Sequence, residues 1–167
     1  KTIIIDTTAP TVSSFTTTAA AGSYKIGEVI EIAANTNEPI QSGNNITVTL
    51  NNTNNTTVVL TASDDGTTMV GTYTVASGDS TSKLAISSFS IGTANKPTDN
   101  AGNVMTSTTV PTGSNMFTGK TIIIDTTAPT VSSFTTTTAA GSYKEGEAIQ
   151  IIANTNETIQ SGNEITV

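Results

Sequence analysis

The stretch that decides the fold is residues 29–34, which reads VIEIAA and returns as AIQIIA at residues 148–153. Between the two copies the first, third and fifth residues change, whereas Ile30, Ile32 and Ala34 have identical counterparts. Successive side chains of a strand point to opposite faces of a sheet, so tolerance at every second position predicts a strand with one buried face. A helix would instead spread the tolerant positions at a period of about 3.6 residues.

These two copies belong to a repeat that covers much more of the chain. Residues 1–48 and 120–167 are related by an offset of 119 without a gap; seven positions differ and the other 41 of 48 are identical. A period of this length is the size of a domain, so each repeat is expected to have its own core. We predict a closing strand of a preceding repeat at residues 1–6, a complete repeat at 7–125 and the N-terminal part of the next repeat at 126–167.

The composition favours an all-β chain. Thr, Ser and Asn make up 69 of the 167 residues, and only three residues are Leu. β-branched residues fit pleated sheets, and the usual helix formers are scarce. Alternating apolar residues between clusters of turn residues predict a sandwich of about seven strands. The strands are expected near residues 11–17, 28–35, 45–50, 57–62, 68–75 and 83–91, from 103 onward, and at 121–124. A change of apolar parity between Ile86 and Phe89 predicts a bulge near residues 87–88.

Several functions are disfavoured by the residues that the sequence lacks. The chain has no His, Cys or Trp, which removes Ser-His and Cys-His catalysis and zinc sites built from imidazole or thiolate, and we expect no enzyme. Thirteen acidic residues stand against six Lys or Arg, giving a net charge of −7 that argues against binding nucleic acid. No apolar run approaches the roughly 18 residues of a membrane span.

A series of motifs follows in a fixed order along the chain. They are GxYxxGE at residues 22–28, NEP at 37–39, GTYTVASGD at 71–79, DNAGN at 99–103 and IDTTAP at 124–129. In this order they resemble the bacterial Ig-like, cadherin-like repeats of giant surface proteins and adhesins, although the Asn- and Thr-rich residues 51–57 depart from that pattern. The resemblance implies a Greek-key sandwich in tandem repeat at the bacterial cell surface, acting as an extracellular stalk, fibre or sheath segment.

Acidic residues stand at the loops of such a sandwich, whose chain enters at one pole and leaves at the other. Hard cations such as Ca²⁺ prefer carboxylate and carbonyl oxygens, and a cation would relieve the repulsion between neighbouring acids. We therefore predict calcium between repeats, although these acids could equally be solvated turn residues. At the pole where the chain leaves, the expected ligands are Glu28, Asp79 and Asp125, joined by Glu157 of the next repeat. At the pole where it enters, they are Asp6, Glu38 and Asp99, with Asn100 and Asn103 as neutral donors.

Two questions about partners stay open. One alternative function is an adhesin module that recognises glycan or protein through loops at one pole, which the near-identity of the loops in the two copies disfavours. Neighbouring repeats of the same chain are the expected partners. Because residues 126–167 hold only the first strands of a repeat, other copies of the chain are also candidates, by strand complementation or filament assembly.

Overall fold

A computed structural model describes residues 1–64, 66–112 and 119–167 of the chain. In this part the chain forms eleven strands and no helix, so the all-β class is confirmed. Contacts divide the chain into unit 1, Lys1–Thr126, and unit 2, Thr127–Val167. The division falls one residue beyond Asp125, where we placed the end of the complete repeat.

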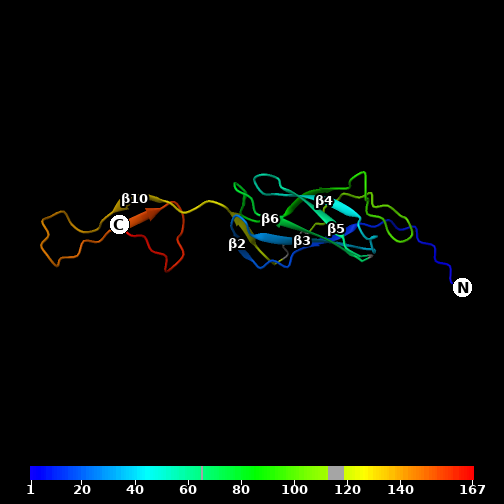
Figure 1. Ribbon diagram of the computed structural model, residues 1–167, viewed down its shortest axis with the longest axis horizontal. Helices are drawn as coiled ribbons and strands as arrows, with labels where there is room; N and C mark the ends of the chain where they lie inside the picture. The colour runs from blue at the N-terminus through cyan, green and yellow to red at the C-terminus, as the bar shows by residue number, and fades with distance from the viewer. Residues whose placement is uncertain (65, 113–118) are drawn as a thin grey trace. The chain divides into compact units, whose positions relative to one another are not determined.

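Unit 1 contains a large and a small sheet (Figure 1). The large sheet has six antiparallel strands in the order β1-β3-β6-β5-β4-β8. These strands are, in the same order, Val12–Thr16, Val29–Thr36, Thr68–Thr74, Thr57–Ala62, Asn45–Leu50 and Ile86–Ser90. The small sheet has the order β2-β9-β7, formed by Gly22–Tyr24, Ile122–Asp125 and Ser80–Thr81. Strand β9 runs parallel to β2 and antiparallel to β7.

Strand β3 has the one-sided burial that its two sequence copies predict. Ile30, Ile32 and Ala34 are fully buried, whereas Val29 and Glu31 are exposed. The positions that vary between the copies therefore lie on the side away from the core. Each large apolar side chain buried in this way contributes about 1.5–3 kcal/mol relative to an exposed one. Strands β4, β5 and β6 alternate in the same manner.

Strand β8 contains the bulge that the change of parity predicts. Thr49 pairs with Ser88 and Leu50 with Ile86, which leaves Ser87 as the extra residue. The Ser87 hydroxyl donates to the carbonyl oxygen of Thr49 at 3.0 Å. The extra residue lets side chains of opposite parity on either side of it reach the same core.

The strand expected from Asn103 onward is wrong for the described residues 103–112. They form only an isolated bridge between Val104 and Thr98, and the closing strand is β9. Just before and at the start of this range, the Asp99 carboxylate accepts the N–H groups of Ala101 and Asn103 and holds the backbone in a turn. The remainder of this expected strand, at residues 113–118, lies outside the described part. Two short strands, β2 and β7, lie outside the ranges where we expected strands.

Residues 1–6 form no strand, and their isoleucines are exposed. We predict that this segment closes a preceding repeat, whose strands would have to lie beside it, so this stays a prediction.

Unit 2 repeats the first pairing of unit 1. Strand β10, Val131–Thr135, pairs with β11, Ile152–Thr155, in the same register as β1 with β3. Its apolar residues are nevertheless exposed: Phe134 is 55% exposed, whereas its counterpart Phe15 is 1% exposed. In unit 1 strand β3 is followed by β6 in the sheet, and the described part of unit 2 has no equivalent of that strand.

Replacing Gly71 of β6 by Ala tests the packing of the large sheet. A Cβ at this position would lie 2.2 Å from the Val59 carbonyl oxygen and 2.8 Å from Leu60 Cδ2. We expect Gly71→Ala to lower the free energy of unfolding by about 1–3 kcal/mol, measured by urea denaturation. The control Thr72→Ala changes the next, exposed position and should alter it by less than about 0.5 kcal/mol. Equal stabilities of the two variants would contradict the close approach of β5 and β6.

Candidate metal site

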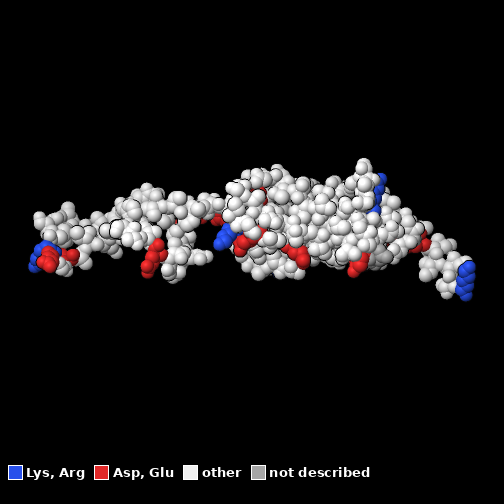
Figure 2. Space-filling view, in the orientation of Figure 1, with Lys and Arg blue, Asp and Glu red and all other residues white. Residues whose placement is uncertain are grey.

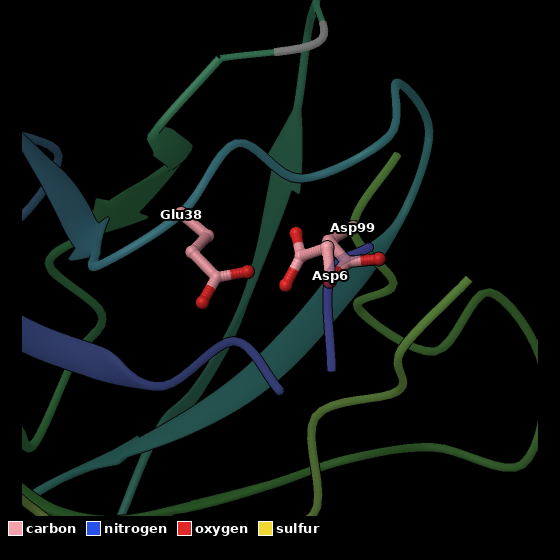
Figure 3. A group of neighbouring side chains, drawn as sticks. All are labelled: Asp6, Glu38 and Asp99. Carbon is pink, nitrogen blue, oxygen red and sulfur yellow. The ribbon is translucent and has the colours of Figure 1, made fainter. Parts of the chain in front are cut away.

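Three carboxylates from distant parts of the sequence meet in unit 1 (Figure 3). Asp6 precedes β1, Glu38 follows β3, and Asp99 lies in the turn after β8. One oxygen of each lies within 4.8 Å of the others. These are the three acids that we expected at the pole where the chain enters, and the structure brings them together.

Asp99 is held by the turn that its own side chain organises. Its Oδ1 accepts the N–H groups of Ala101 at 2.9 Å and Asn103 at 2.8 Å, and its Oδ2 accepts the Asn103 side-chain amide at 2.8 Å. Burial acts to raise the pKa of the Asp99 carboxyl, but these hydrogen bonds outweigh it and the pKa is lowered. Asp99 therefore remains ionised. The DNAGN motif is the sequence of this turn.

Asn103 also connects the turn to the segment ahead of β1. Its side-chain amide donates to the Asp6 carbonyl oxygen at 3.2 Å. The Asp6 Oδ1 in turn accepts the N–H of Thr8 at 3.0 Å. The segment ahead of β1 is thus held beside the rest of unit 1 by a few hydrogen bonds that are exposed to solvent.

Glu38 is the least satisfied member of the group. Its Oε1 accepts the Asn37 side-chain amide at 3.3 Å, whereas its buried Oε2 accepts no hydrogen bond from the described residues. Desolvation raises the pKa of Glu38, and the negative charges of Asp6 and Asp99 raise it further. No positively charged side chain is among the causes of this shift. Charged residues are also sparse on the face of the chain seen in Figure 2. The group has excess negative charge and an unused acceptor.

The geometry of the three oxygens suits a hard cation. Oxygens that share one Ca²⁺ at about 2.3–2.6 Å can lie no more than about 5 Å apart. The group meets this limit. Carboxylate oxygens without imidazole or thiolate favour calcium, magnesium or manganese over zinc or copper. The arrangement can therefore hold a divalent cation, with further oxygens from backbone or water.

The acids expected at the other pole do not assemble in the same way. Among the residues that the structure describes, Glu28, Asp79 and Asp125 do not form a comparable group. The Glu28 Oε2 accepts the N–H of Lys25 at 2.7 Å and closes its own turn, and Asp125 ends β9 opposite Ser80. The four expected ligands at that pole also include Glu157, which belongs to unit 2.

Asp79 has a structural setting that sequence reasoning missed. The residue is fully buried, and its Oδ2 accepts the Tyr73 hydroxyl at 2.7 Å and the N–H of Ala76 at 3.0 Å. Its Oδ1 accepts the Asn54 side-chain amide at 2.8 Å, and the Asn52 amide donates to the Tyr73 hydroxyl at 3.2 Å. The Asn- and Thr-rich stretch at residues 51–57 thus supplies donors to a buried carboxylate.

This network sets the protonation states of Asp79 and Tyr73. Burial acts to raise the pKa of Asp79, but hydrogen bonds from Tyr73, Ala76 and Asn54 outweigh it and lower the pKa. Burial and the hydrogen bond to Asp79 raise the pKa of Tyr73 far above its ordinary value. The pair is therefore a carboxylate and a neutral phenol. Since the pKa of Asp79 is lowered in the fold, its stabilisation is present above the ordinary value of 3.8 and is lost as the pH falls through the lower value.

Comparison with family models, with curated proteins and with solved structures finds no match for this chain. Within the described residues, no helix has the length and apolar character needed to cross a bilayer.

Removing the Tyr73 hydroxyl tests the buried network. We expect Tyr73→Phe to lower the free energy of unfolding by about 1.5–3 kcal/mol at neutral pH, because the hydroxyl donates to a buried charge. The loss should shrink as the pH falls below the ordinary value of 3.8 and through the lower pKa of Asp79, because protonation removes the charge. Tyr24→Phe is the control, since its hydroxyl donates to the exposed Ala20 carbonyl. Urea denaturation across this pH range measures both, and a pH-independent loss would argue against the charged hydrogen bond.

Proposed function

We propose that this chain is a structural extracellular repeat, a segment of a stalk, fibre or sheath in a large bacterial surface protein. In this proposal Greek-key Ig-like beads follow one another, and calcium stiffens the chain where it enters each bead. The observation that carries the proposal is the meeting of Asp6, Glu38 and Asp99 within 4.8 Å. The near-identical repeat at an offset of 119 residues supports the tandem arrangement.

The strand order supports the Ig-like part of the proposal. Immunoglobulin sandwiches place strands A, B, E and D in one sheet and C, F and G in the other. The order β1-β3-β6-β5 corresponds to A-B-E-D, and β4-β8 corresponds to C-F. There are two departures: β5 also pairs with β4, which joins the layers along one edge, and β9 pairs with β2 and β7 in place of β8.

The position of Asp6 gives the proposed cation a mechanical role. Asp6 lies ahead of β1, whereas Glu38 and Asp99 lie in loops of the bead itself. A cation bound to all three would tie the leading segment to the bead more firmly than the exposed hydrogen bonds do. The segment would lose freedom of rotation, and a pulling force would meet a stiffer joint.

The repeat contains counterparts of two of the three acids. At the offset of 119, Asp125 is the counterpart of Asp6 and Glu157 is the counterpart of Glu38. We propose that the same kind of site recurs along the array. Extracellular calcium modules bind with a Kd of about 0.1–1 mM, which suits a site that is filled outside the cell.

Calcium titration of the full chain tests the proposal. We expect millimolar calcium to raise the melting temperature relative to chelator, and Glu38→Gln to weaken calcium binding about tenfold or more by removing a charged ligand. Glu31→Gln is a matched control, because Glu31 is exposed on β3 and its counterpart in the second copy is already Gln150. Isothermal titration calorimetry and thermal melting measure both effects. If the chain binds no calcium, or if both variants respond alike, the calcium part of the proposal is wrong.

The raised pKa of Glu38 predicts the opposite effect of the same variant without calcium. The folded chain binds a proton at Glu38 more tightly than the unfolded chain does, so removing the charge stabilises the fold. In chelator at neutral pH, Glu38→Gln should therefore unfold at a higher urea concentration than the unmodified chain. The difference should fade as the pH falls through the raised pKa toward the ordinary value of 4.5. A variant that is less stable in chelator would show that the acids do not repel one another.

A further inference from the structure

One strand pair of unit 1 differs from all the others in direction. Strand β2 runs parallel to β9, with Gly22 opposite Ile122 and Tyr24 opposite Ile124. Every other pair of strands in the described part of the chain is antiparallel. Strand β2 is the second strand of unit 1 and β9 is its last, so the parallel pair joins the beginning of the unit to its end.

The direction of a strand pair decides how a load along the chain acts on it. Such a load pulls the earlier strand through its N-terminal end and the later strand through its C-terminal end. In an antiparallel pair these two ends lie on the same side, so the backbone hydrogen bonds break one after another. In a parallel pair they lie on opposite sides, so the load acts on all the bonds together. A load along unit 1 therefore slides β2 and β9 past each other.

The contacts of β9 resist this sliding on both of its edges. The N–H of Gly22 donates to the Thr121 carbonyl oxygen at 3.0 Å, and the Ile122 carbonyl oxygen accepts the N–H of Leu84 at 2.8 Å. The side chains of Ile122 and Ile124 are 0% and 1% exposed. Sliding would break these hydrogen bonds and draw two isoleucines out of the core, which is costly in water.

Lys120 adds a contact just ahead of β9 that opposes the same movement. Its ammonium donates to the carbonyl oxygens of Thr17 at 3.3 Å and Ala19 at 3.1 Å. These two residues lie between β1 and β2. A load that pulls them toward the N-terminus, and β9 toward the C-terminus, separates the ammonium from both carbonyl oxygens. The contact lies beyond β1, so it still acts after a load has displaced β1 from β3.

We propose that the parallel pair β2–β9, together with the contact of Lys120 with Thr17 and Ala19, bears a load applied along unit 1. Forced unfolding is governed by the unfolding barrier, so the direction of the load sets its rate as well as the stability of the fold. The inference deepens the proposed stalk function and rests on it for the origin of the load. It does not involve calcium.

Pulling on the same pair from two directions tests the proposal in the full chain, which contains no Cys of its own. Ala21→Cys and Lys25→Cys place a handle at either end of β2, and each is combined with Ala128→Cys beyond the C-terminal end of β9. All three positions are exposed. The Ala21 pair shears β2 against β9, whereas the Lys25 pair peels them apart from one end. Optical tweezers measure the unfolding rate of both at the same constant force.

Each rate under load is divided by the unfolding rate of the same variant without load, which removes any difference in stability. We expect this ratio to be at least about tenfold lower for the Ala21 pair, because several hydrogen bonds must break together. Ratios that agree within about twofold, or that stand in the opposite order, overturn the proposal. Calcium titration tests the proposed function separately, so the two proposals can fail independently.

Replacing the charged donor tests the Lys120 contact. Lys120→Met should raise the ratio about threefold or more for the Ala21 pair, and by less than about twofold for the Lys25 pair, because peeling reaches residue 120 last. Lys83→Met is the matched control, since it removes the same charge from an exposed side chain and should leave both ratios unchanged. If Lys120→Met changes both ratios by the same factor, or neither of them, the Lys120 contact bears no load.

Discussion

The fold of unit 1 depends on covering the apolar face of each strand from the opposite side. Strand side chains alternate between two faces, so a strand becomes stable only when another layer removes its apolar face from water. Ile30, Ile32 and Ala34 are fully buried under this constraint. In unit 2 nearly the same sequence pairs two strands, and Phe134 and Ile151 are more than half exposed there.

Two aspartates illustrate how the neighbouring groups decide the use of the same side chain. Both are almost completely buried, and both have a lowered pKa because hydrogen bonds outweigh desolvation. Both carboxylate oxygens of Asp79 accept hydrogen bonds from the chain, including those from Tyr73 and Asn54, and these bonds stabilise unit 1. Asp99 lies beside Glu38 and Asp6, which carry negative charge, so its surroundings favour a cation.

Repetition of sequence has a physical consequence in this protein. Two of the three acids that meet in unit 1, Asp6 and Glu38, have counterparts in Asp125 and Glu157 at the offset of 119, which suits a series of similar joints.

The class of the fold and the positions of its central strands were determined by the sequence alone. The two-residue period is a local property, so it located β4 and β5 with their observed bounds and the bulge at Ser87. The three acids at the pole where the chain enters could be predicted to lie together, because they are in loops of the fold that the resemblance implied. Only the tertiary structure decided that Gly22–Tyr24 is a strand, since it pairs with residues about a hundred positions further along. It also decided that Asp79 is a buried carboxylate whose oxygens accept hydrogen bonds, because its donor Asn54 comes from a loop that no local pattern connects with it.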